Sequence, residues 1–277
     1  GCRTGARFRI AYTAHAFSDV PAHFSSATHR GDYALTSPWI RTLSGYIKPE
    51  LQLFCLPHAG GNAGLYRGWR EHLPPEIELN VICYPGRLER WQHPIPATMP
   101  ELVGEVSRAI APHLGENWAI FGHSMGAVVA HETILALKCD DLPPPQLLAV
   151  SAREAPQFHQ PGLLHQQDDE ALCQELLRLD GTDPVLLTLP EMRELILPTM
   201  RADYALIEQW QLSSRQLLSC PIAAFMGSED PELDQMQAEG WASWTTASFT
   251  LDCFCGGHFY FREHPQPLLS RLLARLS

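Results

Sequence analysis

The residues with the clearest chemical signature are those at 122–126, which read GHSMG. Ser124 stands between two glycines, directly after the apolar run 118–121 and before a stretch of small and apolar residues. This context is typical of a nucleophile elbow, a tight strand-to-helix turn that projects a serine hydroxyl from the edge of a sheet. Glycines flank such a serine because the turn leaves no room for Cβ atoms. We therefore predict that Ser124 is a nucleophile.

A serine hydroxyl is a weak nucleophile at neutral pH, and it needs an adjacent base that a third group holds in the correct tautomer. His258 follows the last apolar run of the chain in a glycine-containing loop, and it is the predicted base. Asp230 follows the apolar run 222–226 and is the predicted acid, which completes a catalytic triad. Three other carboxylates close by in the sequence stay open as alternatives: Glu229, Asp234 and Asp252.

Acyl transfer also requires hydrogen-bond donors for the oxyanion of the tetrahedral intermediate. The backbone N–H of Met125, next to the nucleophile, is the first predicted donor. We expect the second from the glycine-rich loop 57–64, where we favour the N–H of Ala59 and keep Gly60 as the alternative. Such a loop can also cradle phosphate, but neither a Gly-Lys-Ser/Thr nor a Gly-x-Gly-x-x-Gly pattern follows it. Nucleotide binding is therefore disfavoured.

Alternating strands and helices must position these residues. Apolar runs predict strands at 51–56, 79–84, 118–121, 147–150, 222–226 and 249–253, and helical patterns lie at 65–72, 99–114, 125–138, 236–244 and 266–276. Such alternation is typical of an α/β protein with a mostly parallel sheet. The interval 156–214 interrupts this rhythm with helical patterns at 168–179 and 191–211. An insertion after a strand of such a sheet predicts a helical lid or substrate pocket.

Composition restricts the classes of partner. With 31 acidic and 20 basic residues the net charge is −11, so we expect neither a nucleic acid nor a membrane as partner. The eight cysteines show no metal-type spacing, which predicts reduced thiols, a cytoplasmic setting and no metal site.

Residues 1–46 lack a sustained hydrophobic period and are predicted to be a flexible N-terminal extension. We expect one catalytic domain at 47–277, acting as a monomer.

Several motifs together resemble those of the type II thioesterases, the editing enzymes of polyketide and non-ribosomal peptide synthesis. In chain order they are residues 56–61 (LPHAGG), 84–87 (YPGR), 122–126 (GHSMG), 151–156 (SAREAP), 200–204 (MRADY) and 257–259 (GHF). The resemblance covers about 51–273 and implies an α/β-hydrolase fold with helices on both sides of the sheet. It also implies hydrolysis of acyl thioesters from the phosphopantetheine arm of acyl or peptidyl carrier proteins, without a cofactor.

In this family the lid forms the acyl chamber. The resemblance therefore implies a chamber lining of Leu186, Leu187, Leu195, Ile196 and Tyr204. Four arginines, Arg67, Arg70, Arg87 and Arg90, flank the expected mouth in sequence and could meet an acidic carrier protein. Arg87 is the one most open to a structural role, because its motif sits at a turn. Arg87 and Tyr204 are the candidate substrate- or carrier-binding residues.

Other activities share the same motifs. A chain-releasing thioesterase for medium-chain fatty acyl groups of a fatty acid synthase would differ in chain-length preference. A carboxylesterase or lipase would cleave oxygen esters at least as well as thioesters, and an acyltransferase would differ only in the final acceptor. A non-catalytic carrier-binding subunit is disfavoured by the presence of all three triad residue types.

Overall fold

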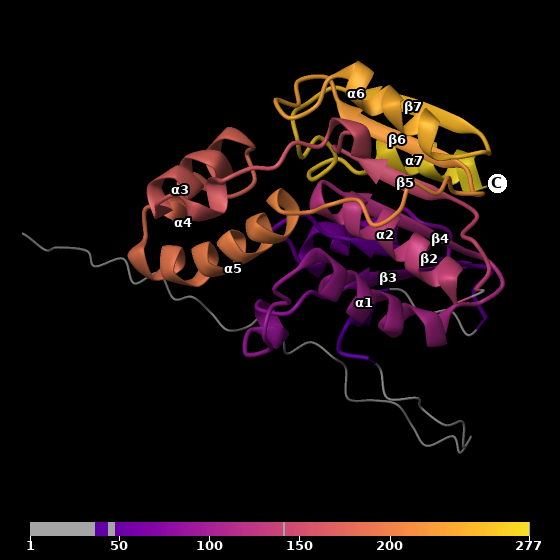
Figure 1. Cartoon of the computed structure of the whole chain (residues 1–277), viewed down its shortest axis with the longest axis horizontal. Helices are drawn as coiled ribbons and strands as arrows, with labels where there is room; N and C mark the ends of the chain where they lie inside the picture. The colour runs from indigo at the N-terminus through magenta and orange to yellow at the C-terminus, as the bar shows by residue number, and fades with distance from the viewer. Residues whose placement is uncertain (1–36, 44–47, 141, 277) are drawn as a thin grey trace, which may run out of the picture. The chain divides into compact units, whose positions relative to one another are not determined.

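The computed structural model describes residues 37–43, 48–140 and 142–276, and they contain a seven-stranded sheet (Figure 1). Its strands are β1 (Ile40–Thr42), β2 (Leu51–Leu56), β3 (Ile77–Ile82), β4 (Trp118–His123), β5 (Leu148–Ser151), β6 (Ile222–Gly227) and β7 (Phe249–Phe254). Their spatial order is β1-β3-β2-β4-β5-β6-β7. Neighbouring strands from β3 to β7 are parallel, and β1 is antiparallel to β3. The predicted α/β-hydrolase architecture is confirmed, and the six predicted strands end within about two residues of the observed ones.

Strand β1 corrects the predicted start of the domain. Its residues pair with Asn80–Ile82 of β3, although 1–46 was predicted to be an extension. Trp39, just before the strand, is buried in the core. The compact unit therefore starts at Ser37 rather than at residue 47. A three-residue edge strand leaves too short a pattern to be detected in sequence. The rest of the predicted extension, 1–36 and 44–47, lies outside the described residues.

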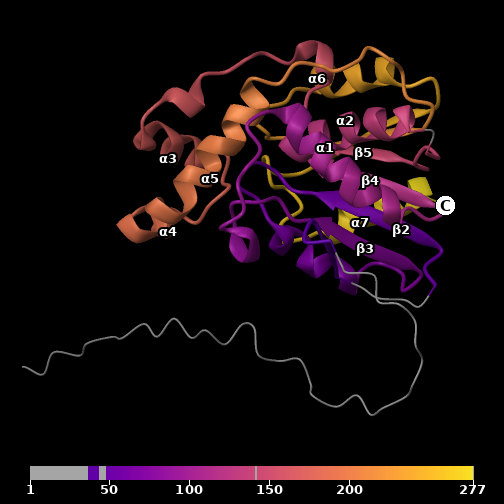
Figure 2. The same cartoon turned by 60° about the horizontal axis from the view of Figure 1, so that its bottom comes forward.

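Helices cover both faces of the sheet, as Figures 1 and 2 show. The helices α1 (Met99–Ile110) and α2 (Met125–Cys139) pack on one face, and the 3₁₀ helix η2 (Ala63–Glu71) and helix α7 (Gln266–Leu276) pack on the other. Successive side chains of a strand point to opposite faces. Phe54 of β2 accordingly joins the first core and Leu53 the second. Both faces of β2 are thus buried, which explains why its sequence is almost continuously apolar.

Shorter helices lie between these elements. They are η3 (Leu88–Arg90), η4 (Ala111–His113), η5 (Pro156–Phe158), η6 (Leu164–Gln166), α6 (Gln235–Glu239) and η7 (Gly240–Trp244). The helix predicted at 236–244 is thus an α-helix that continues as a 3₁₀ helix, α6 followed by η7. In the described part of the chain, no helix is long and apolar enough to cross a bilayer.

The interval 156–214, for which we keep the name lid, contains η5, η6 and the helices α3 (Asp169–Arg178), α4 (Pro184–Leu187) and α5 (Pro190–Glu208). The lid has a small apolar core of its own, made of Leu172, Cys173, Leu176, Leu187, Leu197 and Met200. Glu208, at the end of α5, accepts hydrogen bonds from the N–H groups of Leu164 (2.8 Å) and His165 (2.9 Å). The first and last segments of the lid are therefore tied together.

Candidate active site

Ser124 occupies a strained turn between β4 and α2. Its backbone has φ 53° and ψ −119°, and its N–H donates to the carbonyl of Ser151 (2.8 Å). A non-glycine residue in this region costs about 1–3 kcal/mol and persists only where the surrounding structure enforces it. The predicted nucleophile therefore lies in the conformation that an elbow requires.

The two flanking glycines are required by contact with backbone atoms. A Cβ atom at Gly122 would overlap the carbonyl of Gly126, and one at Gly126 would overlap the carbonyl of Leu56. Backbone atoms of the first turn of α2 and of the central strand β2 cannot move aside as a flexible side chain can. The two glycines of the GHSMG motif are therefore required by close packing of the elbow, at Gly122 against the start of α2 and at Gly126 against the end of β2.

Replacement of Gly122 with alanine is expected to lower the free energy of unfolding by about 3 kcal/mol, because the added methyl group has no space. Urea denaturation of both proteins measures the difference. Gly68→Ala is the control, since a Cβ at this exposed position of η2 has no atom within 4 Å. Equal stability of Gly122→Ala and the wild-type protein would contradict the packing requirement.

The loops after β6 and β7 bring Asp230 and His258 together. Nδ1 of His258 lies 3.0 Å and 2.9 Å from the two carboxylate oxygens of Asp230. Both side chains are almost fully buried, and Asp230 also accepts the N–H of Glu232 (2.9 Å). A carboxylate at Nδ1 holds the proton there and leaves Nε2 free to accept one. The pair thus has the geometry of a base with its orienting acid.

The other carboxylates have different surroundings. Asp234 caps helix α6, Asp252 forms ion pairs with two arginines of α7, and Glu229 is exposed. Of the four candidate acids, Asp230 is the one whose carboxylate contacts the imidazole of His258.

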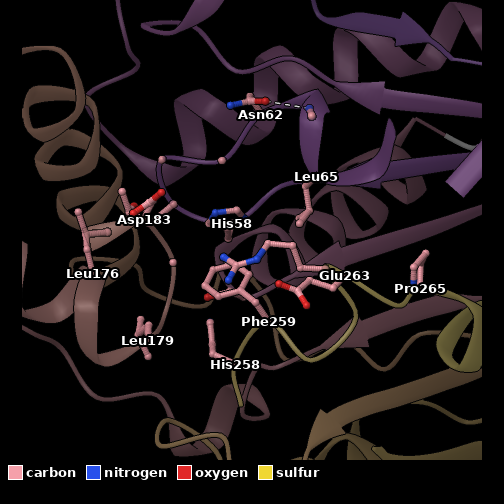
Figure 3. Close-up of a pocket in the computed structure, with 18 of the residues that line it drawn as sticks. His58, Asn62, Leu65, Leu176, Leu179, Asp183, His258, Phe259, Glu263 and Pro265 are labelled. Atoms are coloured by element: carbon pink, nitrogen blue, oxygen red, sulfur yellow. Dashed lines mark hydrogen bonds between the residues drawn. The ribbon is translucent and has the colours of Figure 1, made fainter. Parts of the chain in front are cut away.

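Ser124 and His258 line one cavity of about 690 Å³. Three segments surround it: the stretch 58–72, the lid stretch 176–204, and the loop 258–266 after β7. Figure 3 shows Leu176 and Leu179 of the lid on one side of this space and Phe259 in its centre. The cavity therefore lies between the lid and the carboxyl ends of the strands, where the sequence places the substrate pocket.

Of the five residues predicted to line the chamber, three line the cavity and two do not. Leu186, Ile196 and Tyr204 line the cavity. Leu187 and Leu195 do not line it, so both predictions are wrong: Leu187 is buried in the core of the lid, and Leu195 is 66% exposed to solvent. These leucines occupy other faces of the lid helices, and their hydrophobicity alone did not reveal which face each would take.

The prediction that Arg87 and Arg90 meet a partner is also wrong, because both are buried. The guanidinium of Arg87 forms two hydrogen bonds with the carboxylate of Asp203 (2.8 and 2.7 Å). That of Arg90 donates to a backbone carbonyl (2.6 Å) and stacks over a tryptophan ring. Arg67 and Arg70 of η2 are exposed beside the cavity and keep the predicted location.

The surroundings of the glycine-rich loop narrow the choice of oxyanion donor. The N–H of Gly60 donates to Oδ2 of Asp203 (2.7 Å), so this amide is already engaged. Ala59 lines the cavity, and Met125 is the first residue of α2, where a backbone N–H has no intrahelical acceptor. Ala59 and Met125 therefore remain the candidate donors.

Sequence reasoning missed two histidines beside the site. The imidazoles of His58 and His123 are packed edge to face at 5.9 Å, and His123 lies 5.2 Å from the ring of His258. Burial lowers the pKa of His58 to about 3 and that of His123 well below its ordinary value. Both rings are thus neutral at pH 7 and do not repel an imidazolium at His258. In the sequence, the signal that could have identified these histidines is their position within the LPHAGG and GHSMG motifs.

In the residues that the structure describes, no three His, Cys, Asp or Glu side chains are grouped so that they could hold a metal ion. The cavity contains the serine and imidazole described above, together with backbone N–H groups from the glycine-rich loop. These groups can carry out acyl transfer through a serine ester.

The sequence and the fold can be compared with those of known proteins. The Thioesterase domain family model matches residues 51–276. The chain is 37% identical to thioesterase PikA5 of Streptomyces venezuelae (81% of this chain, 80% of that protein) and 32% identical to the gramicidin S biosynthesis protein GrsT of Aneurinibacillus migulanus (82% and 89%). The structure of BorB, a type II thioesterase from the borrelidin biosynthetic cluster, superimposes with a TM-score of 0.80 at 34% identity, covering 88% of this chain and all of that one. The chain therefore belongs to the thioesterase family of serine hydrolases with the α/β-hydrolase fold, and its relatives include type II thioesterases of polyketide and peptide biosynthesis.

Proposed function

We propose that this protein hydrolyses acyl thioesters on the phosphopantetheine arm of acyl or peptidyl carrier proteins in polyketide or non-ribosomal peptide biosynthesis. One observation carries the proposal: the strained Ser124 and the Asp230-paired His258 line the same cavity under the lid. The similarity to thioesterases named for such pathways supports the biosynthetic context.

In the first half of the reaction, Oγ of Ser124 attacks the thioester carbonyl carbon while its proton passes to Nε2 of His258. The carboxylate of Asp230 stabilises the resulting imidazolium, and the N–H groups of Ala59 and Met125 donate to the oxyanion. Collapse of the tetrahedral intermediate breaks the C–S bond. The pantetheine sulfur leaves as the thiol, with the proton from the imidazolium, and the acyl group remains as a serine ester.

In the second half, His258 accepts a proton from a water molecule as the water oxygen attacks the acyl-serine carbonyl. The second tetrahedral intermediate collapses when Ser124 Oγ leaves and recovers its proton from the imidazolium. The products are a carboxylic acid, which then ionises, and the regenerated enzyme. The two halves need no group beyond the three side chains, the two backbone N–H groups and one water molecule.

The cavity suits an acyl chain. Its volume of about 690 Å³ lies within the usual range for small-molecule sites, about 300–1,000 Å³. The lid contributes five of its apolar lining residues, Leu176, Leu179, Leu186, Ile196 and Met200. Burial of the acyl chain against these side chains removes apolar surface from water and so favours binding.

The test follows acyl release from carrier proteins loaded with acetyl, aminoacyl or medium-chain groups, by intact mass, with an oxygen ester and Ser124→Ala as controls. We expect rapid unloading of acetyl or aminoacyl groups that depends on Ser124. Cleavage confined to medium chains would replace the editing role with chain release. Preference for the oxygen ester would make the protein a general esterase, and transfer to an added alcohol or amine would make it an acyltransferase.

The exposed arginines of η2 are the proposed docking site for an acidic carrier protein. Arg67 and Arg70 are exposed, while their neighbours Leu65 and Gly68 line the cavity. The double variant Arg67→Glu/Arg70→Glu is expected to raise KM for an acyl carrier protein about 10-fold, because it reverses both charges at the mouth. Steady-state kinetics measure this effect, and kcat should be unchanged.

Arg215 provides a matched control, because it lies at the opposite ends of the strands from the site. Arg215 is exposed in the loop that leads to the amino end of β6, away from the carboxyl ends that carry the site. Arg215→Glu should leave KM for the carrier protein unaltered. An equal rise of KM for a small pantetheine thioester in the Arg67/Arg70 variant would contradict docking, because that substrate lacks the carrier protein.

A further inference from the structure

Two motifs that are far apart in sequence meet at the glycine-rich loop. Arg87 follows β3, and Asp203 lies on lid helix α5, 116 residues later. Their side chains are 8% and 2% exposed, and the guanidinium binds both carboxylate oxygens. A buried charge without its partner is strongly unfavourable, so each side chain requires the other.

The ion pair also holds the oxyanion loop, which we define as residues 57–61. Oδ2 of Asp203 accepts the N–H of Gly60 (2.7 Å), and Nη1 of Arg87 donates to the carbonyl of Gly61 (3.3 Å). Gly60 has a φ of 74°, and a Cβ atom there would overlap Met200, one turn before Asp203 on α5. The loop is therefore held by two hydrogen bonds and by close packing, immediately after Ala59.

We propose that Arg87 and Asp203 are positioning residues that set the oxyanion hole by fixing the loop against the lid. The carboxylate of Asp203 engages the N–H of Gly60, which leaves the preceding N–H, that of Ala59, as the donor to the reacting carbonyl. Arg87 holds that carboxylate in place through its two hydrogen bonds. The proposal rests on the proposed function in one respect, because Ala59 is taken as a donor in that reaction.

The chemistry of Arg87 and Asp203 shows how a role in positioning the oxyanion loop differs from a role in protein stability alone. Well-packed apolar residues often replace a buried ion pair without loss of stability, so cohesion between lid and body does not require these charges. The N–H of Gly60, by contrast, requires an acceptor, because a buried amide without one is unfavourable. The guanidinium of Arg87 has no acceptor atom, so of the two side chains only that of Asp203 can accept this hydrogen bond.

The test compares two double variants that both remove the buried charges. Arg87→Met/Asp203→Asn retains a side-chain oxygen that can accept from Gly60, and Arg87→Met/Asp203→Leu has a side chain of similar size without one. Kinetics use the acetyl thioester of N-acetylcysteamine, which needs no carrier docking. We expect kcat of the leucine variant to lie about 10- to 100-fold below that of the asparagine variant, with KM within about 3-fold.

A second measurement reports on the oxyanion hole directly. Phenylboronic acid forms a tetrahedral adduct with an active-site serine, and its inhibition constant should rise in the leucine variant by the same factor as kcat falls. Equal kcat and equal inhibition constants in two folded variants would overturn the proposal. The wild-type protein offers a further check by NMR hydrogen exchange: the amide of Gly60 should be protected, and exchange at the rate of an open loop would also overturn it.

These outcomes are separable from failure of the proposed function. A wild-type protein that leaves acyl carrier proteins intact, yet cleaves the small thioester through Ser124, would refute the carrier-protein function alone. The comparison of the two double variants would then proceed unchanged. A small thioester cleaved equally well by Ser124→Ala would refute the reaction mechanism itself, and with it the role assigned to Ala59.

Discussion

Replacement of Ser124 with alanine is expected to lower kcat for thioester hydrolysis by about 10⁴- to 10⁶-fold while the protein stays folded. The substitution removes the oxygen that forms the acyl-enzyme, and no other serine lines the cavity in the described part of the chain. Alanine also has the smaller side chain, so it adds no contact in the tight turn between β4 and α2. Release of the free thiol, followed with a thiol reagent, measures the loss.

Ser228→Ala is the matched control for this variant. Ser228 is exposed in the loop after β6, two residues before Asp230, and it does not line the cavity. Its replacement should leave kcat within about 2-fold of the wild-type value, as is usual for surface substitutions. Intact mass of the wild-type protein during turnover adds a second readout, because an acyl adduct should appear on it and be absent from Ser124→Ala. Full activity of Ser124→Ala would refute the acyl-enzyme mechanism.

Replacement of Asp230 with asparagine is the second change with a large expected effect, a fall in kcat of about 10³- to 10⁴-fold. The carboxylate accepts from Nδ1 of His258, whereas the amide of asparagine can donate to it. Donation to Nδ1 would move the imidazole proton to Nε2, the nitrogen that must accept the proton of Ser124. The two side chains have the same shape, so stability should change much less than kcat.

Asp234→Asn provides the control four residues later. Asp234 caps helix α6 by accepting the N–H of Gln237 (2.8 Å), and asparagine is an equally good helix cap. Its kcat should therefore remain near the wild-type value. Parallel thermal melts ensure that any loss of activity in either variant is compared at equal folded fraction. A large fall with Asp234→Asn and none with Asp230→Asn would reverse the assignment of the acid.

The strands and the residues that follow them were predictable from the sequence. Buried parallel strands read as short apolar runs, and polar residues directly after such runs stand at the carboxyl edge of the sheet. Ser124, Asp230 and His258 follow β4, β6 and β7, so their strand ends alone placed them at one edge. Strand β1 was missed because three residues at an antiparallel edge carry too little pattern for periodicity to detect.

The sequence by itself determined the α/β architecture, the elbow and the three side chains of the candidate triad, because each depends on hydrophobic period and chain order. Only the tertiary structure decided what the polar residues of the other motifs contact. Arg87 could equally have met a carrier protein, but Asp203 of the lid turns it inward and the same carboxylate engages Gly60. Periodicity describes neighbours a few residues apart, whereas the contact between Arg87 and Asp203 joins residues 116 positions apart. Such a contact exists only when the lid has packed on the sheet.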